Sequence, residues 1–348
     1  MITSLRVIAL VVPMALGGAC GGGPPGTAAS RVVQRAGTAM GSELRLTAYT
    51  ADQAAAQRAF DTVFSDFERL DRLLSVWRPG SDVLRINAAA GDRPVPVSPE
   101  TRAVLRAARQ VSDWTAGKFD VTFGPLAEVW KFDAQDQDNS IPDDAQIRSR
   151  LPLIDYRRVE IDDEAGTVFL ARQGMRIHLG GIGKGYAVER AAAIFRQSGI
   201  HDFMIQAGGD LYAGGLKEGK PWRLGINDPR GPVGRIFAAV DLSDGTFSTS
   251  GDYARSFIKG GIRYHHLLDP ATGLPARGCR SVTIVADSPM QADALSTGVF
   301  ILGPVDGMAL VERLAGVEAV IVTATNEVIV SSGLKERLVL LGRPTDAP

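Results

Sequence analysis

Cysteine is scarce in this 348-residue chain, which contains only Cys20 and Cys279. Cys20 lies in an N-terminal segment with the features of an export signal. An exported chain that keeps one other cysteine cannot form an internal disulfide. We therefore expect the fold to be stabilised by an apolar core, which a hydrophobic content of 45% can supply.

An excess of positive charge is also missing. The 38 Lys and Arg residues are balanced by 39 Asp and Glu residues, and the formal net charge is −1. Domains that bind nucleic acid generally present a basic face or stripe to the phosphate backbone. The composition therefore argues against a general nucleic-acid binder and is typical of a soluble globular protein.

Several motifs of hydrolases and zinc proteins are absent from the sequence. It contains no H-E-x-x-H and no paired Cys/His spacing of the kind that holds zinc. It also lacks the G-x-S-x-G element on which α/β-hydrolases place their nucleophile. The sequence does contain 39 glycines, and many of them are clustered, which indicates loops with special backbone geometry.

The first 20 residues are typical of an export signal. The segment MITSLR carries one positive charge, and the apolar run VIALVVPMALGGA is too short for a secure membrane span. Cys20 follows small residues, as in a bacterial lipobox, so we predict a signal peptide over 1–20 with a lipidated Cys20; a plain cleaved signal is the alternative. The segment 21–34 is rich in Gly and Pro and predicts a flexible tether. We predict one compact domain over 35–345.

Hydrophobic periodicity predicts a mixed α+β fold. Apolar residues recur every three or four positions over 52–74, which indicates an amphipathic helix, and Ser98 is expected to cap a second helix that ends by Gly117. Further helices are expected near 143–150, 184–198, 290–300 and 305–315. Short alternating segments, beginning with SELRLTAYT at 42–50, predict strands. Since the pattern shows no regular βαβ alternation, we expect mainly antiparallel sheets flanked by helices.

The segment RIHLGGIGKGYAV (176–188) resembles a phosphate-binding loop but fails both standard motifs. His178 occupies the place of the first Gly of a Walker A loop, Gly185 replaces its Ser or Thr, and Tyr186 replaces the third Gly of a dinucleotide fingerprint. A glycine turn that opens a helix still presents backbone N–H groups suited to an anion. The alternative is a glycine turn that packs closely for steric reasons.

Three other segments carry candidate chemistry. QAGGDLYAGG (206–215) is most simply a tight hairpin with an acid inside it. In DSPMQADALSTGVF, Asp293 and Thr297 lie four residues apart on one helix face, which suits either Mg²⁺ or an ordinary polar helix start. In GIRYHHLLDPATGLPA, His265 and His266 are adjacent, so on a strand only one of them can face a given site.

The order of these segments resembles the ApbE family of FAD:protein FMN transferases. The resemblance rests on MGSELRL, LSVWRPGSDVLRIN, GKFDVTFGPLAEVWKF, HLGGIGKGYAVERA, QAGGDLYAGG, STSGDY, YHHLLDPATGLPA and ADALSTGVFILG, and it spans residues 38–333. It implies an α+β fold of two intimate T-fold-like halves. It also implies a Mg²⁺-dependent enzyme that attaches the FMN half of FAD to a Ser or Thr hydroxyl of an acceptor protein and releases AMP.

The resemblance also implies roles for individual residues. His266 matches the residue proposed to activate the acceptor hydroxyl, and Gly181, Asp293 and Thr297 match Mg²⁺ ligands. The positions that match FAD contacts are Met40, Trp77, Lys118, Phe119, Asp120, His178, Lys184 and Leu267. His178 departs from the family, in which most members carry Asp or Glu at this position; this affects the expected FAD affinity and pH dependence, not the reaction class.

The resemblance further implies a place in the cell and a class of partner. We expect a lipoprotein anchored on the periplasmic side of the bacterial cytoplasmic membrane, acting on subunits of membrane redox complexes that expose a Thr or Ser motif. Two other functions remain open at this point. One is a Mg²⁺-dependent FAD pyrophosphatase with water as the acceptor, and the other is a lipoprotein that binds flavin without catalysis.

Overall fold

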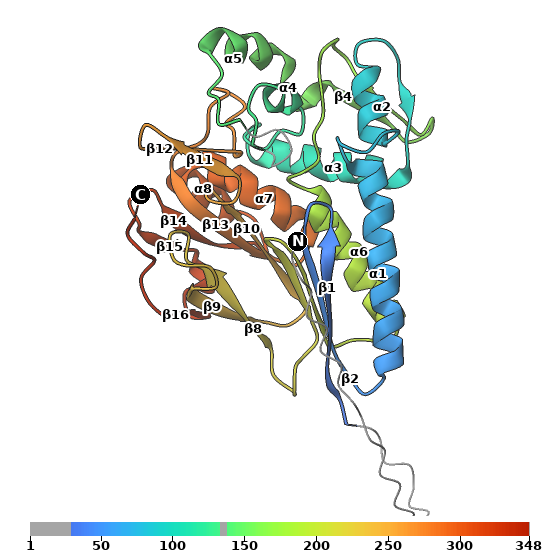
Figure 1. Cartoon of the computed structure of the whole chain (residues 1–348), viewed down its shortest axis with the longest axis vertical. Coiled ribbons are helices and arrows are strands. Elements are labelled where there is room, and N and C mark those ends of the chain that lie inside the picture. Colours follow the sequence, from blue (N-terminus) through green and yellow to red (C-terminus); the bar gives the residue numbers. More distant parts are fainter. Residues whose placement is uncertain (1–28, 133–137, 348) are drawn as a thin grey trace, which may run out of the picture.

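The computed structural model describes residues 29–132 and 138–347, and a single eight-stranded antiparallel sheet organises them (Figure 1). The predicted signal peptide, with Cys20, lies outside the described residues. The strands follow the order β1 (Arg31–Ala39), β2 (Ser42–Thr50), β6 (Phe203–Ala207), β7 (Asp210–Gly214), β10 (Gly245–Gly251), β13 (Cys279–Ala286), β14 (Glu318–Thr323) and β15 (Val328–Val330). The alternation of SELRLTAYT is realised in β2, where Leu44, Leu46 and Ala48 are buried.

The sheet consists of two halves with the same order of elements. The first half contributes β1, β2, β6 and β7, with helices α1 (Gln53–Leu74) and α6 (Gly183–Gln197) between its two strand pairs. The second contributes β10, β13, β14 and β15, with α7 (Pro289–Leu302) and α8 (Pro304–Val311) in the corresponding place. The halves meet where β7 pairs with β10. The prediction of an α+β fold with two intimate halves and mainly antiparallel strands is confirmed.

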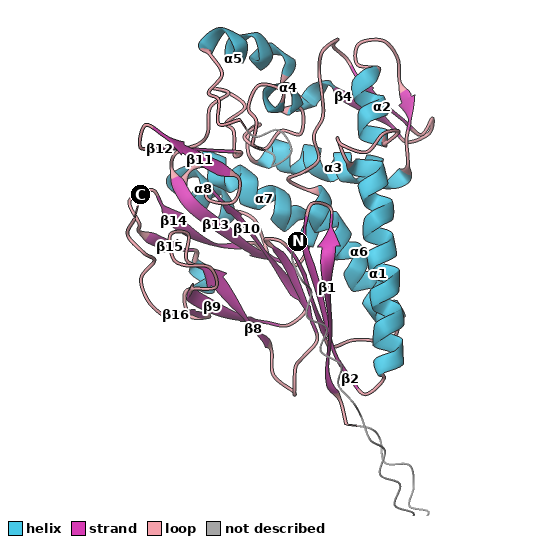
Figure 2. Ribbon diagram, in the orientation of Figure 1, coloured by secondary structure: helices cyan, strands magenta, loops and turns pink. Residues whose placement is uncertain are grey.

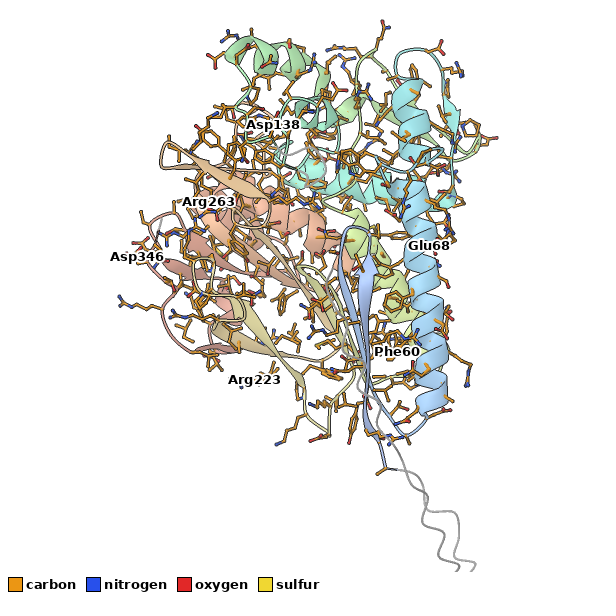
Figure 3. All side chains as sticks on the ribbon, viewed as in Figure 1. Phe60, Glu68, Asp138, Arg223, Arg263 and Asp346 are labelled. Atoms are coloured by element: carbon orange, nitrogen blue, oxygen red, sulfur yellow. The ribbon has the colours of Figure 1, made fainter. Side chains whose placement is uncertain are left out.

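The helices cover one face of this sheet and enclose the main core (Figure 2). The apolar stripe expected over 52–74 forms the inner face of α1, where Phe60 is fully buried, while Glu68 lies on the outer face (Figure 3). Helix α3 (Pro99–Trp114) begins as predicted, because the Ser98 hydroxyl accepts a hydrogen bond from the backbone N–H of Thr101. Helix α7 packs on β10 and β13 and contacts α6.

A smaller three-stranded sheet covers the opposite face. It contains β8 (Trp222–Asn227), β9 (Ile236–Leu242) and β16 (Leu338–Leu340). Phe237 and Leu224 from this sheet pack against Phe247 and Val320 of the central sheet in a second core cluster. The part of the central sheet beneath this small sheet is therefore buried on both faces, which explains why β13 is buried along its whole length.

Insertions between the main elements build one end of the molecule. The segment between α1 and α6 contains α2 (Asp82–Ala88), β3 (Val95–Pro96), α3, α4 (Gly124–Ala127), α5 (Asp144–Arg150), two short 3₁₀ turns (Leu151–Leu153 and Tyr156–Arg158), β4 (Val159–Asp162) and β5 (Thr167–Leu170). A hairpin of β11 (Ser256–Lys259) and β12 (Ile262–His265) is inserted between β10 and β13. A further 3₁₀ turn (Ser332–Leu334) precedes β16.

One predicted boundary is wrong. The tether was expected to extend to residue 34, but β1 begins at Arg31 and pairs with β2 from Arg31 opposite Thr50. Residues 31–34 are therefore part of the sheet edge. None of the helices formed by the described residues is both long and apolar enough to cross a membrane.

Candidate functional site

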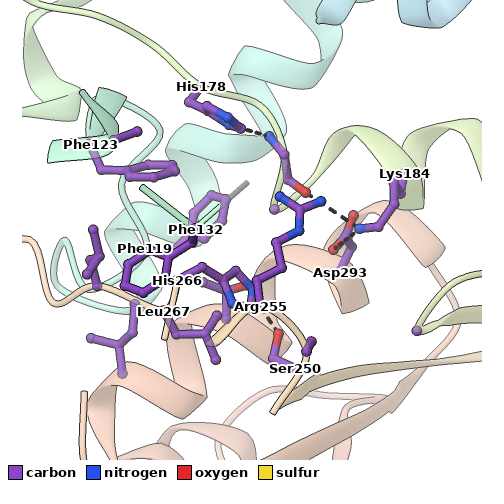
Figure 4. Close-up of a pocket in the computed structure, with 18 of the residues that line it drawn as sticks. Phe119, Phe123, Phe132, His178, Lys184, Ser250, Arg255, His266, Leu267 and Asp293 are labelled. Carbon is purple, nitrogen blue, oxygen red and sulfur yellow. Dashed lines mark hydrogen bonds and ion pairs between the residues drawn. The ribbon is translucent and has the colours of Figure 1, made fainter. Parts of the chain in front are cut away.

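A pocket of about 300 Å³ lies where the insertions meet the ends of α6, α7 and β10 (Figure 4). Of the site residues implied by the resemblance, ten line this pocket: Lys118, Phe119, Asp120, His178, Gly181, Lys184, His266, Leu267, Asp293 and Thr297. They come from four separate stretches of the sequence. One end of the pocket is polar and charged, and the other is aromatic.

Lys184 and two carboxylates form the centre of the polar end. The Lys184 ammonium lies 2.9 Å from a carboxylate oxygen of Asp210 and 3.6 Å from one of Asp293. Burial lowers the pKa of Lys184, but the attraction of both carboxylates outweighs it, so the pKa lies above its ordinary value. Burial and the charge of Asp210 raise the pKa of Asp293. The lysine is therefore charged and shared between two acids.

The glycines of the turn at 180–185 have two different surroundings: Gly185 packs against α7, and Gly181 lies on the pocket wall. A side chain at Gly185 would place its Cβ 2.3 Å from the carbonyl oxygen of Pro289, so only glycine allows α6 to approach α7 this closely. The Gly185 N–H then donates to Asp293 over 2.8 Å. Gly181 lies on the pocket wall, where its Cβ would come within 3.5 Å of the Thr297 hydroxyl. The steric interpretation therefore holds for Gly185, while Gly181 faces the pocket.

Asp293 and Thr297 both face the pocket from α7, as their four-residue spacing predicts. The Thr297 hydroxyl lies 3.3 Å from the hydroxyl of Ser250, which comes from β10. Asp293, Thr297 and Gly181 thus bring a carboxylate, a hydroxyl and a glycine backbone to one wall of the pocket. No group of three or more His, Cys, Asp or Glu side chains suited to a metal occurs among the described residues.

The two adjacent histidines have different surroundings. His265 ends β12 and is buried, and its Nε2 lies 2.7 Å from the carbonyl oxygen of Ala276. Burial lowers the pKa of His265 to about 4, so it is a neutral core residue. His266 lines the pocket, and its Nδ1 is buried without a hydrogen-bond partner among the described residues. The expectation that only one of them faces the site is confirmed, and that residue is His266.

The imidazole of His266 is neutral at physiological pH. Burial lowers its pKa to about 3, and the nearby positive charge of Arg255 acts in the same direction. The His266 backbone N–H donates to the Arg255 carbonyl oxygen over 3.1 Å, so the hairpin holds the two residues side by side. An unprotonated imidazole with an uncommitted ring nitrogen is the form that can accept a proton.

The aromatic end of the pocket is formed by Phe119, Phe123, Trp130 and Phe132 together with Leu267. The Trp130 and Phe132 rings are stacked with their centroids 5.5 Å apart, and the Trp130 indole N–H donates to the Gly273 carbonyl oxygen. Such a lining favours a flat, largely apolar ring system.

Two of the implied cofactor contacts have structural partners of their own. Lys118 forms an ion pair with Asp269 at 2.8 Å, which fixes the turn after His266. The Asp120 carboxylate accepts hydrogen bonds from the N–H and hydroxyl of Thr122 and from the Tyr156 N–H. Both residues line the pocket while they shape its wall.

His178 takes the place of an acid in the glycine turn. Its Nδ1 accepts a hydrogen bond from the Gly180 N–H over 3.0 Å, as a carboxylate oxygen at this position could do. Its ring also contacts Phe123, with the centroids 5.2 Å apart. A histidine can therefore keep the turn closed and extend the aromatic end of the pocket.

Met40 and Trp77 are not among the described residues that line the pocket. Trp77, which follows the end of α1, is 54% exposed. Met40 lies in the turn between β1 and β2 and packs against the main core, while the adjacent Gly41 reaches the pocket. The structure does not bring these two predicted residues to the site, and their role stays a prediction.

Sequence reasoning missed Asp210, Ser250 and Arg255, which also line the pocket. Asp210 was recognised only as an acid in a hairpin. Ser250 and Arg255 belong to the segment STSGDYAR, whose serines had no base nearby in the sequence. The sequence feature that could have identified Asp210 is its place directly after Gly208 and Gly209, at the start of a strand that is buried.

Comparison with known proteins agrees with this geometry. The sequence model of the ApbE family matches residues 40–321. This chain belongs to the ApbE family. It is 32% identical to an FAD:protein FMN transferase of Klebsiella pneumoniae, with 87% of this chain and 93% of the relative aligned, and 32% identical to one of Treponema pallidum, with 97% and 96% aligned.

Solved structures of the ApbE family have the same fold. The ApbE protein of Thermotoga maritima superposes with a TM-score of 0.81 at 33% identity, covering 88% of this chain and 99% of the other. The flavin transferase ApbE of Vibrio cholerae gives 0.78 at 28% identity with the same coverage.

Proposed function

We propose that this ApbE-family enzyme transfers the FMN half of FAD to a Ser or Thr hydroxyl of an acceptor protein. The hydroxyl oxygen forms a bond to the FMN phosphorus, the bond from that phosphorus to the oxygen of AMP breaks, and AMP leaves. The names of the relatives support this proposal, as does a pocket with one aromatic and one charged end. The flavin matches the aromatic lining, and the pyrophosphate matches the end that contains Lys184.

The observation that carries the proposal is the position of His266. Its neutral imidazole, with an uncommitted Nδ1, lines the same pocket as Lys184 and Asp293. An alcohol is a poor nucleophile at neutral pH, and a positioned imidazole can take its proton during attack, which typically contributes about 10²- to 10⁴-fold. We assign this general-base role to His266.

The donors on the α7 wall fit a magnesium ion. Mg²⁺ prefers oxygen ligands and usually takes only one or two carboxylates together with substrate phosphates and water. Asp293, Thr297 and the Gly181 carbonyl would hold it. When bound, the ion would polarise the pyrophosphate and stabilise negative charge on the leaving AMP.

The remaining pocket residues position and shield the substrate. The Lys184 ammonium compensates phosphate charge, and the apolar wall formed by Phe119, Phe123 and Leu267 limits the room for water beside the bound FAD. Exclusion of water matters because water at the same position would convert transfer into hydrolysis of FAD.

The reaction is tested by incubating the enzyme with FAD, Mg²⁺ and an acceptor protein that exposes a Thr or Ser motif. We expect the intact mass of the acceptor to rise by one FMN less one water. Release of AMP and free FMN without a modified acceptor would instead show a pyrophosphatase. Retention of intact FAD throughout would show a flavin-binding protein without catalysis.

We also propose that the enzyme is exported and anchored through a lipid on Cys20, so that it acts on the periplasmic side of the cytoplasmic membrane on subunits of redox complexes. The sequence features of residues 1–20 support this proposal. In cell fractionation, the wild-type protein should sediment with membranes and the Cys20→Ala protein should not. Equal distribution of the two proteins would contradict the lipid anchor.

A further inference from the structure

Asp210 is a buried acid in the pocket to which the reaction assigns no role. It is the first residue of β7, after a hairpin turn at Gly208 and Gly209. A Cβ on Gly209 would lie 2.7 Å from the Thr249 carbonyl oxygen, so the turn must approach β10 closely. The hairpin therefore aims Asp210 at the interior, where its side chain is only 4% exposed.

Both carboxylate oxygens of Asp210 have a defined neighbour. Oδ1 accepts a hydrogen bond from the Ser248 hydroxyl, and Oδ2 lies 2.9 Å from the Lys184 ammonium. Asp293 Oδ1 lies 3.6 Å from the same ammonium, and its Oδ2 accepts a hydrogen bond from the Gly185 N–H. Asp210 is thus the nearer of the two acids that share Lys184.

A chain of hydroxyls, buried at Ser248 and Ser296 and half-buried at Ser250 and Thr297, connects Asp210 to the wall that would hold the metal. Ser248 lies 3.4 Å from Ser296, Ser296 lies 2.7 Å from Ser250, and Ser250 lies 3.3 Å from Thr297. The Ser296 hydroxyl is also placed to donate to the Asp293 carbonyl oxygen. Such a connected network fixes the orientation of each member because few alternative partners are available in the interior.

We propose that Asp210 is a positioning residue that holds the Lys184 ammonium and keeps it from pairing fully with Asp293. Asp293 then keeps its carboxylate available to a divalent cation, while Lys184 stays at the pyrophosphate end of the pocket. This inference rests on the proposed function, since it assigns Asp293 to the cation and Lys184 to the phosphates.

The charges at this end of the pocket support the assignment. Lys184 carries one positive charge near two carboxylates, so these three groups together are negative when both acids are ionised. Without the Asp210 charge, Lys184 and Asp293 would neutralise each other as a buried pair. The ammonium would then compete with Mg²⁺ for the same carboxylate.

The test compares Asp210→Asn with the wild-type enzyme and with Asp241→Asn. Asp241 is a half-exposed acid on β9 outside the pocket, so its variant makes the same chemical change without touching the site. Calorimetry of the FAD-loaded protein measures Mg²⁺ affinity, and flavin fluorescence measures the FAD Kd without metal. We expect Asp210→Asn to weaken Mg²⁺ binding by about 10- to 100-fold, a typical cost of losing a partner behind a metal ligand. Asp241→Asn should bind Mg²⁺ and FAD like the wild type.

A double-mutant cycle separates positioning from a general structural role. In a Lys184→Met background no ammonium can move to Asp293, so Asp210→Asn should weaken Mg²⁺ binding much less than it does in the wild type. An equal loss in both backgrounds, or an unchanged Mg²⁺ affinity in folded Asp210→Asn protein, would overturn the proposal.

Ser248→Ala keeps the proposal testable if Asp210→Asn does not fold. It removes only the hydroxyl that donates to Asp210, so we expect a smaller loss of Mg²⁺ affinity in the same direction. A stable Ser248→Ala protein with wild-type Mg²⁺ affinity would contradict the proposal.

Failure of the proposed function is recognised separately. If the wild-type enzyme modifies no acceptor while the cycle still shows coupling between Asp210 and Lys184, the transfer reaction is wrong and the positioning role stands.

Discussion

The two ends of the pocket are built in different ways. The charged end comes from regular elements, with Lys184 on α6, Asp210 on β7 and Asp293 on α7, and its charges are already paired with one another. The aromatic end comes mostly from the insertion between α1 and α6, where Phe123 and Phe132 lie outside regular strands. We infer that the central sheet fixes the chemistry, while the insertion supplies the surface that recognises the flavin.

Loss of the base should give the largest effect. His266→Ala is expected to lower the rate of FMN transfer by about 10²- to 10⁴-fold, because the acceptor hydroxyl then has no group to take its proton. FAD binding should change little, since the aromatic end and Lys184 remain. Acceptor mass spectrometry and flavin fluorescence measure the two quantities. His201→Ala, a change at an exposed histidine, is the matched control, and a wild-type rate for His266→Ala would contradict the assigned role.

Asp293→Asn should affect the charged end next most strongly. The substitution keeps the size of the side chain but removes a metal ligand, so the Mg²⁺ concentration for half-maximal AMP release should rise by about 10- to 100-fold. The melting temperature of the protein should identify any loss of folding. If AMP release kept its wild-type dependence on Mg²⁺, Asp293 would not be a ligand.

The aromatic end should control affinity rather than rate. Phe123→Ala removes a ring from the pocket wall and should raise the FAD Kd by about 3- to 10-fold, consistent with 0.5–1.5 kcal/mol for an aromatic pair. The rate at saturating FAD should stay near the wild-type value. Trp77→Ala changes an exposed ring outside the pocket and should have less effect on the FAD Kd. A larger effect at Trp77 would show that FAD binding brings this residue into the site.

His178→Asp should have the smallest effect. An aspartate can accept the Gly180 N–H that His178 now accepts, so transfer activity should stay the same or rise. Steady-state transfer assays measure the change. A loss of more than about tenfold, which corresponds to 1.4 kcal/mol in the activation free energy, would give His178 a role of its own.

The sequence predicted those features that depend on local pattern. The stripe of α1, the cap at Ser98 and the common face of Asp293 and Thr297 all follow from helical spacing. The adjacent histidines were expected to face opposite ways for the same kind of reason. The family resemblance then identified which of the two faces the pocket.

The missed features depend on contacts between distant residues. Lys184 and Asp210 are brought together by a helix and a hairpin, and Lys118 reaches Asp269 across 151 positions of sequence. No periodicity encodes such pairs. The exposure of Trp77 likewise depends on the path of the chain after α1. The family resemblance implied a contact between Trp77 and FAD, but it could not predict where the ring lies.

The central claim is that the phosphorus–oxygen bond broken in FAD becomes a bond to a protein hydroxyl. The most direct measurement quantifies AMP released and FMN bound to the acceptor in one reaction of the wild-type enzyme with FAD, Mg²⁺ and acceptor. Our account predicts equal amounts of the two products and no acceptor-bound FMN when the acceptor Ser or Thr is replaced by Ala. AMP accompanied by an equal amount of free FMN, with an unmodified acceptor, would contradict it.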